Sequence, residues 1–310
     1  MTLEATLTGI FNSDYKIFEL ILVDDGSSDN SVSIAGNFPC RILSNEKNTG
    51  AAAARNRGAQ VAKGDILLFI DADVIVARDT LTGFCAVFKD GSADAVVGVY
   101  GRAKNFSNPS SVYKNLFLHF SQDNDSARFW SGCAAVKKEV FFRCGGFDEN
   151  IKGALVEDTA FGYALLEANC KIKIQRDIRV LHNHCYTLVG LYRNEFSKTV
   201  EWVKLLMRHD TRIKTGGYYL NRTNVLSLMC VAGGIVSLLF SAMLGFPLGF
   251  LLIFCLFVFF AALNGRFYAL LVKEAGPKYI LLGPLLNILS YVAAITGIIY
   301  AEISVFKTRG

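Results

Sequence analysis

The stretch that decides the fold is Gly64-Asp-Ile-Leu-Leu-Phe-Ile-Asp-Ala-Asp73. It consists of an apolar run over residues 66–70 that is followed at once by Asp71 and Asp73. A run without polar residues is typical of a strand that is buried on both faces, as in a parallel sheet. We therefore predict a central strand over residues 65–70 that ends in two carboxylates.

The segments around this strand alternate short apolar runs with helical stretches, which is the pattern of βα units. Residues 18–23 predict a strand that ends in Asp24 and Asp25, residues 40–43 a second strand, and the alanine-rich residues 50–62 a helix. The carboxyl ends of strands in an open α/β sheet line the ligand crevice. We therefore expect the two acidic clusters to share one site.

The rest of the front part continues this alternation. Further strands are predicted over 94–99, 130–136, 171–175 and 179–182, and helices over 110–120, 137–143 and 156–169. The predicted fold class is therefore α/β, with a Rossmann-like, mostly parallel sheet flanked by helices.

The C-terminal part has the composition of a membrane protein. Hydrophobic residues make up 52% of the chain and charged residues 19%, against about 45–50% and about 25% in soluble domains. Charged residues are absent from 223–265 and from 279–301, and about 20 apolar residues suffice for a helix to cross a bilayer. We predict membrane helices over 224–244, 247–263 and 279–303, and hence a multi-pass membrane protein.

Charge and cysteine content exclude other classes. The net charge is +5, and only two acidic and five basic residues follow Thr223, so the front part is almost neutral. A nucleic-acid partner is not expected, because such proteins carry a one-sided basic excess. The eight cysteines contain no C-x-x-C pair, which fits reduced thiols rather than a disulfide framework or a zinc site.

The segment between the two parts, residues 188–222, predicts an amphipathic juxtamembrane helix. Its apolar residues recur at helical spacing, whereas Arg193, Lys198 and Lys204 take other positions. Such a helix can lie on the headgroups of an anionic leaflet and so contact membrane lipids. An ordinary surface helix that packs on its own domain is the alternative.

The distribution of basic residues predicts which side each loop faces. Basic residues precede the first predicted span, and others, such as Arg266 and Lys273, lie between the second and the third. By the positive-inside rule, these regions and the domain before them are cytoplasmic. Three spans would place Lys307 and Arg309 outside, against the rule, so a third segment that lies partly in the interface is an alternative.

Asp71 and Asp73 predict a metal site. They lie two residues apart just past a strand, where both can face one Mg²⁺ or Mn²⁺ ion whose shell phosphate oxygens complete. Acidic residues in a solvated turn are the alternative for a D-x-D pattern on its own.

Other motifs accompany this one, in the following order along the chain: Val23-Asp-Asp-Gly-Ser-Ser-Asp29, Asn48-Thr-Gly-Ala-Ala-Ala-Ala-Arg-Asn-Arg-Gly58, Gly64 to Asp73 as quoted, Gly145-Gly-Phe-Asp-Glu149 and Glu157-Asp158. Together they resemble the family 2 glycosyltransferases of the GT-A fold, from Phe18 to about Val200. The resemblance implies a GT-A-like domain over residues 1–187, followed by the helix over 188–222 and a transmembrane region over 223–310.

The resemblance also implies roles for the acidic residues. Asp25, with Asp24 beside it, resembles the carboxylate that reads the base of a UDP- or GDP-linked sugar donor. Asp71 and Asp73 resemble the ribose and metal–diphosphate contacts. Asp158 resembles the general base, which takes a proton from the attacking hydroxyl; capping a helix is its alternative.

Three other residues are candidates through the same resemblance. His182 of His182-Asn-His184 is implied as a further metal ligand, with a structural histidine as the alternative. Arg55 is a candidate donor contact, or else covers its helix surface with its stem. Gly132 of Trp130-Ser-Gly-Cys133 resembles the small-residue segment beneath the donor sugar, or else lies in a buried strand.

The implied activity is an inverting, metal-dependent transfer of a single sugar, because the Q-x-x-R-W motif of processive synthases is absent after His184. The membrane helices suggest a lipid-linked saccharide or polyprenyl phosphate acceptor at the cytoplasmic face, as in the assembly of cell-envelope polysaccharides. If the acceptor is a phosphate, Asp158 positions it rather than deprotonating it.

The chain departs from the family at its start, because residues 1–17 predict the helix that follows the family's first strand. Without that strand, we expect unpaired backbone groups on its two neighbours, at a cost of about 1–3 kcal/mol for each buried group. Either the true start lies upstream or the chain is a divergent copy. A non-catalytic membrane scaffold is therefore the alternative function.

Overall fold

The computed structural model describes residues 2–102, 106–123, 129–151, 156–208, 221–244 and 248–309. The chain divides into two compact units, and each is described by itself. The first comprises Met1–Ala103 and Gln122–His184, and the second Lys104–Ser121 and Cys185–Gly310. The last of the three boundaries, after His184, lies close to residue 187, where we predicted the α/β domain to end. Residues 104–121, however, group with the C-terminal helices rather than with the α/β unit.

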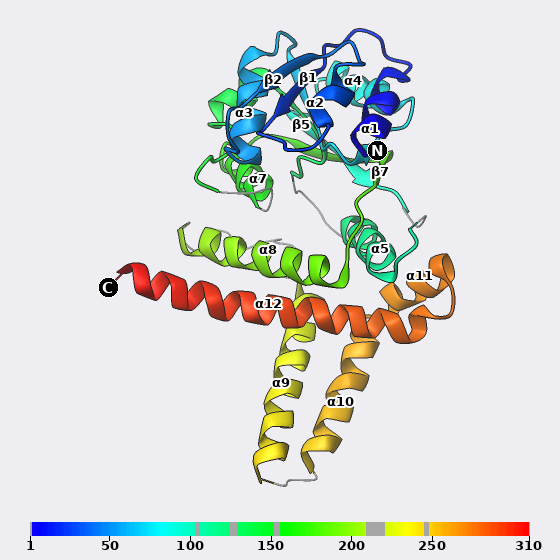
Figure 1. Ribbon diagram of the computed structural model, residues 1–310, viewed down its shortest axis with the longest axis vertical. Helices are drawn as coiled ribbons and strands as arrows, with labels where there is room; N and C mark the ends of the chain where they lie inside the picture. The colour runs from blue at the N-terminus through cyan, green and yellow to red at the C-terminus, as the bar shows by residue number, and fades with distance from the viewer. Residues whose placement is uncertain are drawn as a thin grey trace. The chain divides into compact units, whose positions relative to one another are not determined.

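The first unit alternates strands and helices (Figure 1). Its elements are α1 Thr2–Phe11, β1 Ile21–Asp24, α2 Ser31–Ala35, β2 Arg41–Ser44, α3 Ala51–Val61, β3 Ile66–Ile70, β4 Val74–Ile75, α4 Thr80–Lys89, β5 Ala95–Tyr100, β6 Cys133–Lys137, α6 Lys138–Arg143, α7 Glu157–Glu167 and β7 Ile172–His182. These bounds confirm the predicted strands and helices to within a few residues. The two short strands predicted over 171–182 instead form the single strand β7, whose pairing with β5 is interrupted by a register shift.

The main sheet is mixed rather than mostly parallel. Its strand order is β3-β6-β5-β7-β4. Only β5 and β7 pair in parallel, whereas β6 runs antiparallel to both of its neighbours and β4 runs antiparallel to β7. Apolar runs report burial but not strand direction, which is why the sequence suggested a parallel sheet.

The strand β3, which was predicted to be central, lies at an edge of this sheet. Strand β1 pairs in parallel with β2 in a separate two-stranded sheet, and no ladder among the described residues joins β1 to β3. Only Leu67 is buried in β3, whereas every residue of β5 is buried. The separation of β1 from β3 agrees with the expectation that strands in this part of the domain have an unpaired edge.

The core of the first unit lies between the main sheet and the helices α3, α6 and α7. Phe141 and Phe161 pack against each other with ring centroids 5.2 Å apart, and Phe147 lies 5.2 Å from Phe161. Small residues of the sheet, such as Ala134, let these rings approach. The core thereby fixes α3 and α7 beside the ends of β3 and β5.

The second unit is entirely helical in its described part. Its elements are α5 Pro109–Asp123, whose last residues belong to the first unit, α8 Leu188–Arg208, α9 Arg222–Leu244, α10 Leu248–Leu263, α11 Gly265–Ala275 and α12 Tyr279–Arg309. The helices predicted over 224–244, 247–263 and 279–303 are thus present. Residues 245–247, between the first two predicted spans, lie outside the described residues, as do residues 209–220 of the segment predicted as an amphipathic helix.

Some of these helices are long and apolar enough to cross a bilayer. Among the described residues they are two, over Arg222–Met243 and Tyr279–Val305; α10 and α11, bent by 66° at their junction, make a third if the pair is one span. This agrees with an association with membranes.

Candidate functional site

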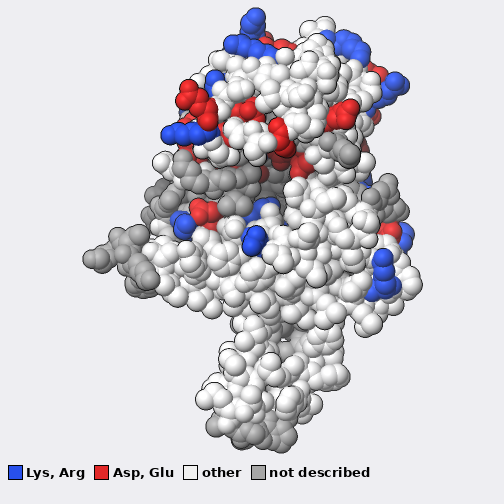
Figure 2. Space-filling view, viewed as in Figure 1, with Lys and Arg blue, Asp and Glu red and all other residues white. Residues whose placement is uncertain are grey.

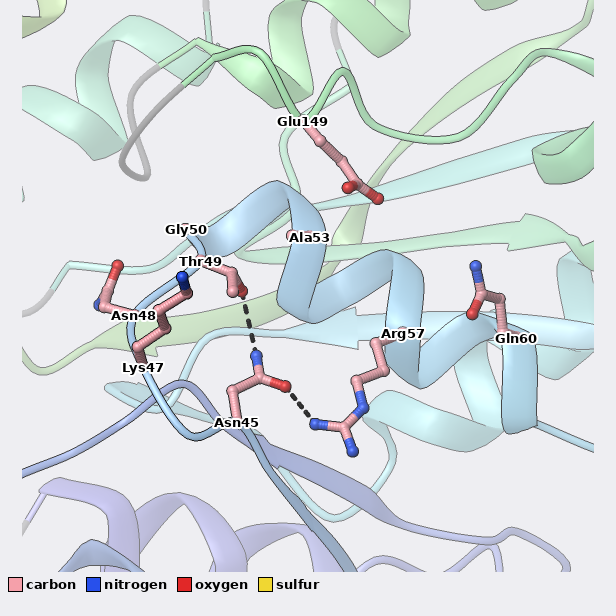
Figure 3. A pocket seen from close by; sticks show the side chains of 9 residues that line it. All are labelled: Asn45, Lys47, Asn48, Thr49, Gly50, Ala53, Arg57, Gln60 and Glu149. Carbon is pink, nitrogen blue, oxygen red and sulfur yellow. Dashed lines mark hydrogen bonds between the residues drawn. The ribbon is translucent and has the colours of Figure 1, made fainter.

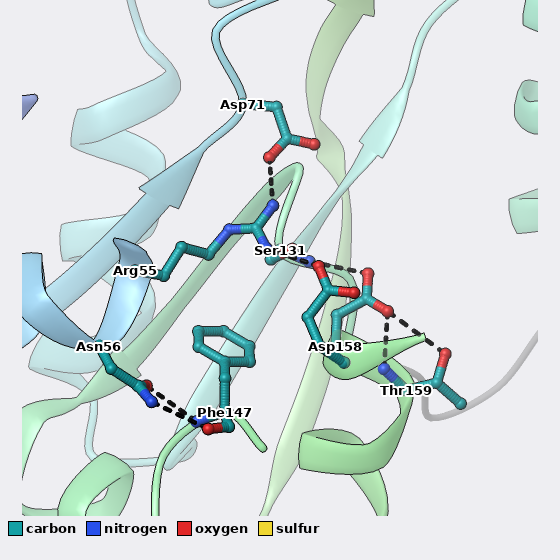
Figure 4. Close-up of polar contacts among 8 residues, drawn as sticks. Arg55, Asn56, Asp71, Ser131, Phe147, Asp158 and Thr159 are labelled. Carbon is teal, nitrogen blue, oxygen red and sulfur yellow. Dashed lines mark hydrogen bonds and ion pairs between the residues drawn. The ribbon is translucent and has the colours of Figure 1, made fainter. Parts of the chain in front are cut away.

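Arg55 on α3 joins three elements of the first unit (Figure 4). Its Nη2 donates a hydrogen bond to Oδ1 of Asp71 at 2.7 Å, and its Nη1 donates to Oε1 of Glu157 at 2.6 Å. Burial alone would lower the pKa of Arg55, but the charges of Asp71 and Glu157 outweigh it and raise that pKa. The guanidinium also lies 5.7 Å from the ring centroid of Phe147. One buried cation therefore ties α3 to the end of β3 and to the first turn of α7.

Asp73 forms a second polar group with two histidines. Its Oδ2 is 3.0 Å from Nδ1 of His184 and 3.8 Å from Nε2 of His182. The backbone sets this arrangement, since β4 directly follows Asp73 and pairs with β7 so that Val74 lies opposite His182. Burial tends to raise the pKa of Asp73, but the hydrogen bond with His184 and the nearby imidazoles lower it overall.

Tyr100, at the end of β5, connects these groups. Its pKa is raised well above the usual value because the phenol is buried and the charges of Asp71, Asp73 and Asp158 disfavour a phenolate. Its ring centroid lies 5.2 Å from that of His182. A neutral phenol therefore lies near carboxylates from two distant parts of the chain, one holding Asp71 and Asp73 and the other Asp158.

Gly132 leaves room for this phenol. A Cβ atom at this position would lie 2.1 Å from the hydroxyl oxygen of Tyr100 and 3.2 Å from Oδ2 of Asp71. The carbonyl of Gly132 also accepts a hydrogen bond from the backbone N–H of Asp71 at 3.2 Å. Glycine is therefore required at position 132, because Tyr100 and Asp71 lie too close to its backbone to leave room for a side chain.

Asp158 lies in the first turn of α7, beside the segment that contains Gly132. Its Oδ1 accepts a hydrogen bond from the N–H of Thr159 at 2.7 Å, and its Oδ2 accepts one from the N–H of Ser131 at 3.3 Å. The dipole at a helix N-terminus favours an ionised carboxylate at this position. Asp158 thus belongs to the same cluster as Asp71 and Asp73.

Asp25 anchors the start of α3. Its carboxylate accepts hydrogen bonds from Nδ2 of Asn45, from the N–H and the hydroxyl of Thr49, and from the N–H of Gly50, all within 2.9 Å. Burial acts to raise the pKa of Asp25, but these donors lower it below its usual value. Oδ1 of the buried Asp24 accepts from the N–H of Ser27 at 3.1 Å. Asp25 therefore holds the start of α3, the helix that carries Arg55, whereas Asp24 holds the turn after β1.

Asn56, next to Arg55, fixes the loop that follows α6. Its side chain exchanges two hydrogen bonds with the backbone of Phe147, at 2.8 and 3.0 Å, and donates another to Glu149. Gly146 in this loop has a φ of +68°, and a Cβ atom there would lie 2.9 Å from Oδ1 of Asn56. The glycine pair of the motif thus serves a backbone shape that an L side chain would strain.

A polar hollow of about 600 Å³ lies over the outer face of α3 (Figure 3). Asn45, Lys47 and Arg57 are among its lining residues, and Glu149 lies across from them. Arg57 donates to the carbonyl oxygen of Ser44 at 2.8 Å. Through Asn45 and Thr49 the hollow adjoins Asp25, whereas Asp71, Asp73 and Asp158 do not line it.

The residue types of this site suit a divalent cation, but their side chains do not form a complete coordination site. Carboxylate and imidazole are suitable donors, and Asp73, His182 and His184 already adjoin one another. However, no three His, Cys, Asp or Glu side chains in the described ranges are arranged to hold an ion. One oxygen of Asp71 is taken by Arg55, so the residues that would hold a cation here are Asp73 and the histidines.

The structure thus brings most of the predicted site residues together. Tyr100 has near it Asp71, Asp73, Asp158, Gly132 and His182. Arg55 is bonded to Asp71. Asp25, with Asp24 beside it, lies at the start of α3, the helix that carries Arg55. Sequence reasoning missed Tyr100, the pairing of Glu157 with Arg55 and the contact of His184. The position of Tyr100 at a strand end was the available signal for it, since strand ends line such sites.

The first unit is thus an α/β unit in which acidic side chains lie at the ends of strands. Residues 1–146 match the family model described as Glycosyl transferase family 2. These residues, just under half of the chain, are therefore similar to glycosyltransferase family 2.

Two curated relatives show the same similarity. The chain is 38% identical over 96 residues to the glycosyltransferase GlyG of Streptococcus pneumoniae, covering 29% of this chain and 32% of that protein. It is 49% identical over 172 residues to an uncharacterized glycosyltransferase of Haemophilus influenzae, covering 53% of this chain and 57% of that one. The matches thus span less than two thirds of either relative.

Among solved structures, a mannosyltransferase of Pyrobaculum calidifontis in complex with GDP-Man and Mn²⁺ superposes with a TM-score of 0.57 at 19% identity. The alignment covers 96% of this chain and 83% of that one. This likeness shows the fold.

The contact between Gly132 and Tyr100 predicts a steric effect with a specific rescue. Gly132→Ala should lower the thermal stability and any transfer activity, because the added methyl overlaps the phenol oxygen. Tyr100→Phe removes the overlapping oxygen atom. The loss of stability in the double variant should therefore be smaller than the sum of the losses in the two single variants. Thermal unfolding of the full chain in detergent measures these losses. Additive effects would contradict the contact.

The carboxylate of Asp25 predicts a pH dependence of stability. Its pKa is lowered on folding, so its stabilising effect is present above the unfolded value of 3.8 and is lost as the pH falls through the lower folded value. Asp25→Asn should therefore destabilise the chain at pH 6, and the difference from the wild type should shrink below pH 3.8. Unfolding by denaturant at several pH values measures this, with the exposed Asp65→Asn as control. A difference that is independent of pH would contradict the assignment.

Proposed function

We propose that the chain is an inverting, metal-dependent glycosyltransferase. It transfers a single sugar from a UDP- or GDP-linked donor to a lipid-linked saccharide or polyprenyl phosphate at the cytoplasmic face of a membrane. The observation that carries this proposal is that Arg55 links Asp71 to the first turn of α7, which holds Asp158, while Asp73 contacts two histidines, in a part of the chain that matches the family 2 model. The long apolar helices of the same chain support a lipid-linked acceptor.

The donor chemistry explains why the histidines and Asp73 lie together. A diphosphate is repelled by carboxylates, and a divalent cation, when bound, would neutralise it as a leaving group. Asp73, held by His184, presents the oxygen suited to that cation. Mn²⁺ and GDP-Man in the related mannosyltransferase support the choice of ion and donor class.

In this proposal, Asp158 acts on the acceptor. A carboxylate at this position takes the proton from an attacking hydroxyl, and a phosphate acceptor would need only to be positioned. Arg55 pairs with the neighbouring Glu157 and so offsets a negative charge next to Asp158. A single displacement at the sugar carbon inverts its configuration.

A non-catalytic membrane scaffold is the second candidate, and the divided sheet favours it. The oxygens of Asp25, the expected base-reading residue, are engaged by the start of α3, and β1 is separate from β3. A panel of radiolabelled UDP- and GDP-sugars with membrane lipid extract and Mg²⁺ or Mn²⁺ distinguishes the two candidates. Label in the organic phase supports the enzyme, whereas neither transfer nor nucleotide binding supports the scaffold.

The role of Asp73 predicts the outcome of its removal. Asp73→Ala should reduce Mn²⁺-stimulated transfer or donor hydrolysis by more than about 100-fold, as expected when charge stabilisation at a leaving group is lost. Initial rates over a range of Mn²⁺ concentrations measure this, and the exposed Asp65→Ala should retain the wild-type rate. A variant at Asp73 with unchanged metal stimulation would remove this residue from the metal site.

The role of Asp158 predicts a separation of binding from turnover. Asp158→Asn should lower kcat with a hydroxyl acceptor by about 10²–10⁴-fold, the usual contribution of a general base, while the Kd for the donor nucleotide stays nearly unchanged. Glu167→Gln, at the exposed end of the same helix, is the matched control. An unchanged kcat would show that another group takes the proton.

A further inference from the structure

The helices α9 and α10 form a hairpin (Figure 1), and its exterior is apolar. They pack closely, because a Cβ atom at Gly249 would lie 1.7 Å from the hydroxyl oxygen of Ser241. Their outward side chains are large and apolar, as at Leu248 and Phe254, each 63% exposed. Figure 2 shows no charged residue on the visible face of this projection. Such a surface suits hydrocarbon rather than water.

Hydrogen-bonded polar side chains gather at one end of this hairpin. Nδ2 of Asn264, just past α10, donates to the hydroxyl of Ser227 at 2.9 Å, near the start of α9. Asn224, also in the first turns of α9, accepts from the hydroxyl of Tyr291 at 3.1 Å. Tyrosine is enriched where a membrane meets water. This end of the hairpin therefore marks the boundary of the hydrocarbon.

The helix α12 crosses the hairpin at that end. Tyr291 lies well inside α12, so the interior of this helix meets the beginning of α9. Figure 1 shows α12 running crosswise to α9 and α10. A helix that spanned the bilayer beside the hairpin would instead run parallel to α9 and α10. Its middle residues would then lie at the same depth as the middle of the hairpin.

The C-terminal half of α12 lies alongside α8. The hydroxyls of Tyr192 and Thr296 are 2.8 Å apart, and the rings of Phe196 and Tyr300 have centroids 5.6 Å apart. At Gly297 a Cβ atom would lie 2.9 Å from the carbonyl oxygen of Phe196. The two helices are thus in backbone contact and must lie at the same depth.

The charges of α8 exclude the hydrocarbon as that depth. Arg193 is exposed, and Lys204 pairs with Glu201 on the same helix at 2.7 Å. Glu195 forms a buried ion pair with Lys114 of α5. Charged side chains at the centre of a bilayer are costly and rare, and a spanning α12 would carry this group of charges into it.

We propose that α12 does not cross the membrane but lies along its surface with α8, so that among the described helices only the α9–α10 hairpin enters the bilayer. The partner of this helix pair is the headgroup region of one leaflet. The exposed residues Leu281, Leu285, Ile299 and Ile303 of α12 recur at helical spacing, and they supply an apolar stripe that suits the boundary between headgroups and acyl chains. The residues after α12 then remain on the side where the hairpin begins.

This arrangement also removes a conflict in the charge distribution. With a third span, Lys307 and Arg309 would lie opposite the other basic segments, against the positive-inside rule. With α12 on the surface, they lie on the same side as Arg266 and Lys273. The inference does not depend on the proposed activity, since it concerns the second unit alone.

The test is the labelling of added thiols in sealed membrane vesicles that contain the full chain. Three variants are compared with the parent chain, whose own cysteines give the background: Ser92→Cys in the first unit, Glu302→Cys near the end of α12 and Leu248→Cys at the start of α10. All three side chains are exposed. A membrane-impermeant maleimide that adds a visible mass is applied to intact vesicles and, in parallel, after detergent.

In vesicles where Ser92→Cys reacts without detergent, we expect Glu302→Cys to react without detergent as well, and Leu248→Cys to react only after detergent. If Glu302→Cys reacts only after detergent, α12 crosses the bilayer and the proposal is overturned. If Leu248→Cys reacts in the intact vesicles, the hairpin does not cross and the proposal is overturned as well.

Discussion

The candidate site depends on the contacts of one largely buried group, the guanidinium of Arg55. It is the cation that balances Glu157, whose side chain is only 2% exposed, and it holds one oxygen of Asp71. Removing one partner of a buried ion pair typically costs about 3–5 kcal/mol, because the remaining charge is left without compensation. A lysine would not replace it, since only a planar fork of donors reaches two carboxylates in this way. Arg55 therefore adds a polar link between α3, α7 and the end of β3, which the aromatic core also holds together.

The sequence predicted those parts of the site that follow from local pattern. Apolar runs that end in acidic residues located Asp25, Asp71 and Asp73 at strand ends, and the structure confirms those strands. The pairing of Arg55 with Glu157 had no local signal, because the two residues are 102 positions apart. Tyr100 closes a fully buried strand, where an aromatic side chain looks like core.

The direction of strands was the part of the fold that the sequence did not determine. An apolar run such as that of β6 has the same composition whichever way the chain enters the sheet, so its antiparallel pairing with β3 and β5 was not foreseen. The edge position of β3 has a different cause, since it depends on which segments are available to pair with it. Its half-exposed side chains show that an apolar strand predicts burial only when a neighbour is present on each side.

The assignment of residues 104–121 to the helical unit has a consequence for how the protein can be divided. The chain passes between its two units three times rather than once, so no single cut separates them. A fragment that ends after β7 would retain α5 but lose α8, and Lys114 would then be without Glu195. It would also expose Tyr113 and Leu116, which pack against Phe267 and Leu271 in the intact second unit. The front part of the chain, which has the composition of a soluble domain, is therefore not an independent fragment. A cut at the domain boundary predicted from the sequence does not separate the two units.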